Sequence, residues 1–276
     1  MDISTIGLID DEDILLDVAA LALSQQDHGD LNLDRYVEVL REIEEQIREA
    51  GQNAFLSSEQ AAALADVLHG DMGFSGDSEG YDAPINADFI RVLDRRKGLP
   101  ISLAILYVAM ARLAGWDAYV LNVPGHVLVQ VGRTNPVIID PFRGGIAVSQ
   151  AQLVEICKVY LGPAGEAAAQ YVVPMTNREV LSRLLMNQAV RAEQDGDLLR
   201  AFTVYQRMTK VAPDNLDAWH QLARLYQSFG DVAGARHCLL AMLEITNDKE
   251  SRDQILAAFE ALGSSGSTAG PSKNEA

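Results

Sequence analysis

A run of apolar residues at positions 101–113 constrains the fold of this chain more than any other feature. Almost every position in it is apolar or small, so a helix built from it has no polar face and belongs in a protein interior. The apolar stretch 99–111 is shorter than the ~20 residues that cross a bilayer. Pro100 suits the first helical position, where its missing N–H costs nothing, and Gly115 suits a left-handed helix end. We therefore predict a buried core helix.

Three stretches rich in β-branched residues follow this helix, at 118–123, 126–131 and 137–140. Such residues are typical of strands. Pro124-Gly125 and the segment 132–136 supply turn residues between them. The pattern predicts a small antiparallel meander directly after the core helix.

Before the core helix, apolar periodicity predicts helices at 13–25, 33–50 and 59–69. Together they form a helical N-terminal lobe. The first helix is expected to bury one face, which consists of Ile14, Leu15, Val18, Leu21 and Ala22.

The last third of the chain is a repeat array. Residues 182–215 and 216–249 align without a gap at a period of 34 residues. Gly196-Asp197 recurs as Gly230-Asp231, and Ala201 recurs as Ala235. This pattern resembles tetratricopeptide repeats, in which small residues let the two helices of a hairpin approach closely. Because two repeats bury too little surface to stand alone, we expect them to pack on the core.

These elements predict an α+β fold in which a helical lobe, a core helix and a small antiparallel sheet precede an all-α repeat segment. We assign residues 1–165 to the first domain and 176–262 to two repeats plus a closing helix. Residues 263–276 are predicted to be a disordered tail, because they lack core-forming side chains.

A resemblance to a known superfamily rests on the same stretch. Gly98-Leu99, Gly125-His126 and Asp140-Pro141 resemble, in order and spacing, the transglutaminase-like, papain-related core, where a Cys begins the helix and His and Asp lie on the strands. The segments 95–102 and 139–145 closely resemble the bacterial SirB family, which often lacks that Cys and is frequently followed by tetratricopeptide repeats. Here the nucleophile position holds Pro100, and a proline cannot attack a carbonyl.

The resemblance therefore leaves two hypotheses for the core. His126 and Asp140 are either the remnant of a triad with a structural role, or the base and orienting acid of a peptidase, amidase or acyl-transfer enzyme with an unconventional nucleophile. Ser102 is the candidate replacement for the Cys. A buried helical serine more simply hydrogen-bonds back to its own helix, and that is the role we expect for it.

The concave face of a repeat array commonly holds an extended peptide or a helix. Four polar residues fall near positions that line this face, and they are the candidate binding residues: Arg183, His220, Arg224 and Gln227. A solvated surface role is the alternative for each of them. The resemblance implies a protein or peptide partner.

Net charge narrows the range of partners. The chain carries −17 at pH 7, and residues 1–50 hold fourteen acidic and three basic residues. Such a surface repels phosphate backbones and anionic lipids, so neither nucleic acid nor membrane binding is expected. Cys157 and Cys238 lie far apart in helical patterns, and the histidines lack ligand spacing, so we expect no disulfide, metal or cofactor.

From the sequence we therefore favour a cytoplasmic, non-catalytic protein that binds a protein or peptide through its repeats as an accessory or regulatory factor. The enzyme hypothesis remains the alternative. The oligomeric state is not predicted.

Overall fold

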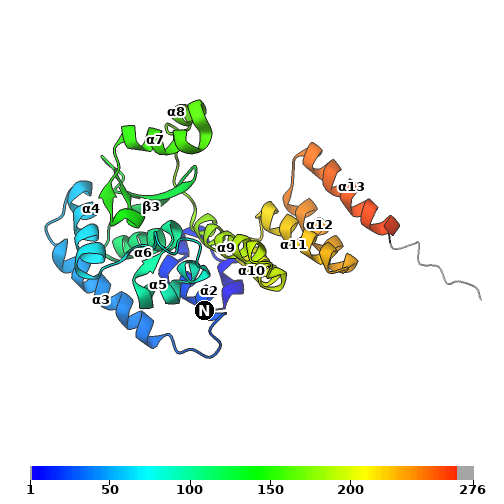
Figure 1. Cartoon of the computed structure of the whole chain (residues 1–276), viewed down its shortest axis with the longest axis horizontal. Helices are drawn as coiled ribbons and strands as arrows, with labels where there is room; N and C mark the ends of the chain where they lie inside the picture. The colour runs from blue at the N-terminus through cyan, green and yellow to red at the C-terminus, as the bar shows by residue number, and fades with distance from the viewer. Residues whose placement is uncertain (1, 266–276) are drawn as a thin grey trace, which may run out of the picture.

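A computed structural model describes residues 2–265, in which a mixed α/β unit leads into a helical array that extends away from it (Figure 1). The α/β unit contains one four-stranded antiparallel sheet among many helices. The predicted α+β class is therefore confirmed.

The N-terminal lobe is helical, as predicted. Its α-helices are α1 (Ile3–Ile6), α2 (Leu16–Gln25), α3 (Asp34–Ala50), α4 (Ser57–Ala65) and α5 (Phe89–Arg95). 3-10 turns at Asp11–Asp13 and Pro84–Ala87 and a π-helical turn at Asp66–Asp71 lie between them. A short parallel pair, β1 (Ser75–Gly76) and β2 (Lys97–Gly98), joins the long loop after α4 to the start of the core helix.

The prediction for the first helix was partly wrong. Helix α2 begins at Leu16, and the side chains of Leu15 and Val18 are exposed rather than buried. Asp11 explains the shift, because its carboxylate accepts hydrogen bonds from the backbone N–H groups of Asn177 and Arg178. These hydrogen bonds stabilise the separate 3-10 turn Asp11–Asp13, and α2 therefore begins later in the chain than predicted. The buried face therefore consists of Leu16, Ala19, Ala20, Leu21, Ala22 and Leu23.

The core helix α6 (Pro100–Leu113) forms as the sequence predicts. Pro100 lies in its first turn, and twelve of its fourteen residues are buried. Gly115 follows the helix with φ of +84°, a conformation that glycine adopts without the steric penalty of a Cβ. The chain can therefore turn directly into the sheet.

The sheet is an antiparallel meander in the order β3-β4-β5-β6. Its strands are β3 (Ala118–Val123), β4 (His126–Val131), β5 (Val137–Asp140) and β6 (Ile146–Ala147). One face packs on α6, and the other contributes Leu121 and Leu128 to a second cluster with Leu153 and Cys157 of α7 (Gln150–Leu161). Helix α8 (Gly165–Ala168) follows α7, and residues 171–175 then pass the outer edge of β3, where the Met175 N–H donates to the Val120 carbonyl.

The repeat array has the predicted period. Its helices are α9 (Asn177–Gln194), α10 (Leu198–Val211), α11 (Leu216–Ser228), α12 (Val232–Ile245) and α13 (Lys249–Ser265). Both hairpin turns repeat in geometry, with φ of +78° at Gly196 and +77° at Gly230, and with Asp197 and Asp231 as N-caps. Helix α13 continues to Ser265, and the rest of the predicted tail lies outside the described residues.

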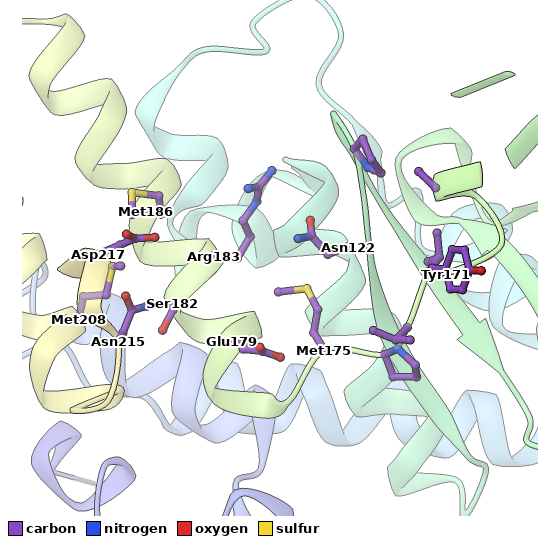
Figure 2. A pocket seen from close by; sticks show the side chains of 15 residues that line it. Asn122, Tyr171, Met175, Glu179, Ser182, Arg183, Met186, Met208, Asn215 and Asp217 are labelled. Carbon is purple, nitrogen blue, oxygen red and sulfur yellow. The ribbon is translucent and has the colours of Figure 1, made fainter. Parts of the chain in front are cut away.

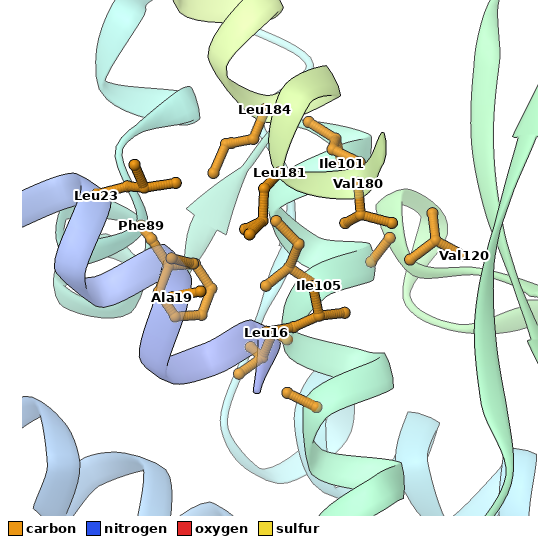
Figure 3. Packing of buried hydrophobic residues seen from close by; sticks show 14 of the residues in the cluster. Leu16, Ala19, Leu23, Phe89, Ile101, Ile105, Val120, Val180, Leu181 and Leu184 are labelled. Carbon is orange, nitrogen blue, oxygen red and sulfur yellow. The ribbon is translucent and has the colours of Figure 1, made fainter. Parts of the chain in front are cut away.

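The first repeat helix belongs to the hydrophobic core of the α/β unit. Figure 3 shows Val180, Leu181 and Leu184 of α9 projecting toward side chains of α2 and α6, among them Leu16 and Ile105. Leu181 is fully buried. The repeats therefore pack on the core, as expected, and α9 is the helix that anchors them.

Ion pairs between α10 and the loop after α2 also join the repeats to the α/β unit. The Asp27 carboxylate, whose side chain is 19% exposed, accepts hydrogen bonds from Arg200 and lies 2.7 Å from Nη2 of Arg207. Burial raises the pKa of Asp27, but the hydrogen bonds from these two guanidinium groups outweigh burial and leave the pKa below its usual value.

Substituting Leu181→Ala should destabilise the α/β unit itself, by about 3 kcal/mol, because the cavity left behind lies in the shared core. Urea unfolding followed by the fluorescence of Trp116, in a chain carrying Trp219→Phe, measures this loss directly. The exposed residue Leu199 on α10 supplies the control, and Leu199→Ala should cost less than about 0.5 kcal/mol. An unchanged Trp116 transition in the Leu181→Ala chain would contradict the shared core.

Substituting Asp27→Asn should lower the free energy of unfolding by about 1–2 kcal/mol at pH 7, because two arginines lose a charged acceptor. A carboxyl group with a lowered folded-state pKa stabilises the protein above its unfolded pKa, and this contribution disappears as the pH falls through the folded pKa. The difference in the free energy of unfolding between wild type and variant should therefore be largest at neutral pH and decrease below about pH 3.8. Urea titrations from pH 7 to pH 3 test this, with Asp30→Asn in the same loop as the control.

Candidate functional site

The first candidate site is the pair formed by His126 and Asp140. His126 begins β4 and Asp140 ends β5, and Nε2 of His126 lies 2.8 Å from Oδ2 of Asp140. The other carboxylate oxygen accepts hydrogen bonds from the backbone N–H groups of Phe142 and Arg143. Asp140 is 1% exposed and the His126 side chain 17% exposed. The carboxylate thus holds both the imidazole and the 3-10 turn that follows β5.

The position that a nucleophile would occupy offers none. Pro100 is buried in the first turn of α6 and carries no ionisable group. Ser102 is fully buried, and its hydroxyl donates to the Asn86 carbonyl at 2.8 Å. The prediction that this hydroxyl bonds back to its own helix was therefore wrong, because the 3-10 turn Pro84–Ala87 places the Asn86 carbonyl within hydrogen-bond distance. The contact nevertheless ties the Ser102 hydroxyl to a structural role.

Tyr107 and the two cysteines, Cys157 and Cys238, all have raised pKa values. Burial and the nearby Asp140 carboxylate raise the pKa of Tyr107, whose buried hydroxyl has no hydrogen-bond partner within residues 2–265. Burial likewise raises the pKa of Cys157, and it raises the pKa of Cys238 to about 11. A thiol needs a lowered pKa to react as a thiolate near neutral pH, so neither cysteine is an activated nucleophile.

The second candidate site is a cavity of about 580 Å³ between the sheet and the repeats (Figure 2). Strand β3, the segment 168–175, helices α9 and α10, and the start of α11 all contribute to its wall. Its apolar side chains include three methionines from separate parts of this wall. The lining residues are Asn122, Pro124, Ala168, Tyr171, Val172, Val173, Pro174, Met175, Glu179, Ser182, Arg183, Met186, Met208, Asn215 and Asp217.

Arg183 is the unusual residue of this cavity. Its side chain is half-buried and donates no hydrogen bond within residues 2–265, and its Nε atom, like that of Arg191, is buried without a partner. Every other arginine that is at least half-buried within residues 2–265 donates a guanidinium hydrogen bond, as Arg95 does to Asp77 and Arg191 to Asp82. Ser182, which is 6% exposed, also has an unpartnered hydroxyl here. The cavity therefore holds donors that the described chain does not satisfy.

The structure places the four predicted binding residues in two separate locations. Arg183 lines the cavity, whereas His220, Arg224 and Gln227 lie exposed on α11 outside its lining. Arg224 pairs with Glu193 at 2.7 Å. The four residues are thus not brought together.

Sequence reasoning did not find the cavity residues on the core side. Asn122 occupies an exposed position of β3, and the segment 171–175 lies between the two domains that we assigned, 1–165 and 176–262. The apolar, strand-like run Tyr171-Val172-Val173 was the available signal. Its meaning depends on the neighbouring β3 edge, which the sequence alone does not place.

Among residues 2–265, no group of three or more His, Cys, Asp or Glu side chains is arranged to hold a metal ion. No helix in the same range combines the length and apolar character needed to cross a membrane.

Comparison with known proteins relates both parts of the chain to families. Residues 34–186 match the sequence model of the transglutaminase-like superfamily, and residues 189–260 match a model of tetratricopeptide repeats. These matches confirm both resemblances inferred from the sequence.

Individual relatives include uncharacterised bacterial proteins. A protein of Xylella fastidiosa named UPF0162 is 28% identical over 91% of each chain, and a UPF0162 protein of Pseudomonas aeruginosa is 27% identical over 76% of this chain and 77% of its own. Human F-box only protein 21 is 29% identical over 72% of this chain and 33% of its own.

If His126 has a structural role, His126→Ala should lower the free energy of unfolding by about 1–3 kcal/mol, because the buried Asp140 carboxylate loses a donor. Chemical denaturation measures this, and His220→Ala, at an exposed position, should change stability by less than about 0.5 kcal/mol. Equal stability of wild type and His126→Ala would contradict a structural role for the pair.

Proposed function

The chain belongs to the transglutaminase-like superfamily, and from this premise we propose that it is a non-catalytic member that binds an extended segment of a partner protein. It acts as an accessory or regulatory factor in the cytoplasm. The binding site is the cavity between β3, the segment 171–175 and the first repeat. Tetratricopeptide repeats supply one wall of that site and the sheet supplies the other.

The cavity itself is the observation that carries this proposal. A volume of about 580 Å³ is within the usual range of ligand pockets. It is lined by apolar and polar side chains from both units, and its donors lack partners within residues 2–265. Part of its apolar lining is open to solvent, since Tyr171 and Val173 are 77% and 68% exposed. An amphipathic peptide matches this combination.

The inert chemistry of the core supports the non-catalytic half of the proposal. Pro100 replaces the nucleophile, Ser102 is engaged with Asn86, and both cysteines are buried. His126 and Asp140 then serve to hold the strand ends together.

One observation favours the alternative, an amidase, peptidase or acyl-transfer enzyme. The Nε2 atom of His126 bonds Asp140, and Nδ1 has no hydrogen-bond partner within residues 2–265, which is the arrangement of a base with its orienting acid. Such an enzyme needs a water or an unconventional nucleophile. A hydrolase and acyl-transfer screen decides this, because activity that is present in the wild type and lost in His126→Ala would favour the enzyme.

A phage-displayed random 16-residue peptide library tests the binding function on the full-length chain. We expect selection to enrich a shared motif whose synthetic peptide binds the wild type at least tenfold more tightly than it binds Asn122→Trp. The substituted position is exposed on β3 and lines the cavity, so the larger side chain should occupy part of the space that a peptide would need. Gln227→Trp on exposed α11 is the matched control and should bind like the wild type.

Two outcomes would count against the proposal. Failure to enrich any motif would contradict a peptide-binding function. Loss of binding in Gln227→Trp but not in Asn122→Trp would move the site to the outer face of α11 and remove the cavity from the proposal. His126→Ala should bind the peptide as the wild type does.

A further inference from the structure

Arg183 shares its cavity with acidic residues of its own chain but, in the described part of the chain, pairs with none of them. Two acids line the same cavity, Glu179 and Asp217. The Glu179 carboxylate accepts hydrogen bonds at the start of α9, from the Thr176 N–H, and Asp217 lies in the first turn of α11. No ion pair joins either of them to Arg183 within residues 2–265. In a chain of net charge −17, an unpaired half-buried guanidinium is an exception.

Leaving this group unpaired is energetically unfavourable. A guanidinium cannot lose its charge near neutral pH, and a partly desolvated cation without a partner destabilises the folded state. The buried Nε of Arg183 has no acceptor. An external acceptor that enters the cavity would remove this penalty, and a carboxylate matches the planar fork of the guanidinium with two parallel hydrogen bonds.

The residues around Arg183 indicate further properties of the ligand besides a negative charge. Figure 2 shows Arg183 from α9 and Asn122 from β3 in the middle part of the cavity, with Asp217 and Tyr171 toward its two ends. The Asn122 side chain has no hydrogen-bond partner among the described residues and can donate through its amide. Met175 and Met186 supply apolar surface beside Arg183, and methionine adapts to side chains of different shapes.

We propose that this cavity binds an extended segment of a partner protein in which apolar residues flank an internal Asp or Glu, and that Arg183 binds this carboxylate. The inference rests on the proposed function and names the chemistry of its partner. The central position of Arg183 favours a side-chain carboxylate over a chain terminus, because the segment then continues toward both ends of the cavity.

Fluorescein-labelled pentapeptide pools with blocked termini test the assignment. The four positions flanking the central residue are equimolar mixtures of Leu, Met, Val and Phe, and the central residue is Glu in one pool and Gln in the other. For the full-length wild type we expect the Glu pool to bind at least tenfold more tightly by fluorescence anisotropy, as charged hydrogen bonds to a carboxylate would give. Arg183→Gln should abolish this preference. Arg91→Gln, at an exposed arginine of α5, should preserve it.

Thermal unfolding of the variants provides a second, independent readout. Arg183→Gln should keep or raise the melting temperature, because it removes an unpaired cation. Arg191→Gln, two turns further along α9, should lower it, because Arg191 bonds Asp82 and Asn187. A clear fall in melting temperature for Arg183→Gln would show that the arginine is already satisfied in the free protein, and would overturn the inference.

Several binding results would also overturn the inference. These are equal affinity for the Glu and Gln pools, unchanged preference in Arg183→Gln, and absence of binding by either pool. A third pool with central Gln and a free C-terminal carboxylate that binds more tightly than the Glu pool would exclude an internal carboxylate. Glutarate alone binding as tightly as the Glu pool would exclude a protein segment. The phage selection separates these results from failure of the proposed function, since it does not require an acidic peptide.

Discussion

The packing of α9 into the core is the contact on which the rest of the structure depends. Leu181 and Leu184 close the space between α2 and α6, so the first repeat helix completes a core that the α/β unit leaves open on that side. The same helix presents Arg183 and Met186 to the cavity. Because α9 is fixed by buried apolar contacts, the cavity has a rigid wall, and binding there does not require the two units to be ordered first.

The core of the superfamily is retained here with Pro100 at the helix start and with His126 paired to Asp140. The carboxylate of Asp140 satisfies two backbone N–H groups in addition to His126, so it would be needed to shape the strand end even if no reaction took place. Pro100 performs the local task of starting a helix, which a cysteine at the same place would do less well. His126, Asp140 and Pro100 thus make contacts that shape the strand ends and the helix start of this chain.

Local patterns in the sequence predicted the elements well, whereas contacts between distant segments were harder to infer. The core helix, the meander and the 34-residue period follow from apolar spacing and turn residues, which are properties of neighbouring positions. The displaced start of α2 was missed because Asp11 accepts a hydrogen bond from Asn177, a residue at the start of the repeat segment. The cavity was missed for the same reason, since Asn122 and Arg183 become neighbours only when α9 docks. Arg183 itself was found from its place in the repeat pattern, which identifies exposed helix positions but not what faces them.

Because the turns at Gly196-Asp197 and Gly230-Asp231 repeat, the array can be extended by further hairpins, but only at the end that points away from the α/β unit. Helices α11 to α13 contact the rest of the chain chiefly through α10, so each further hairpin would stack on the last one without touching the α/β unit. The number of repeats is therefore free to increase by duplication during evolution, whereas the first hairpin and the start of α11, which line the cavity, cannot be lost without changing it. A lineage could lengthen the array, and with it the reach toward larger assemblies, and still keep the same core and cavity.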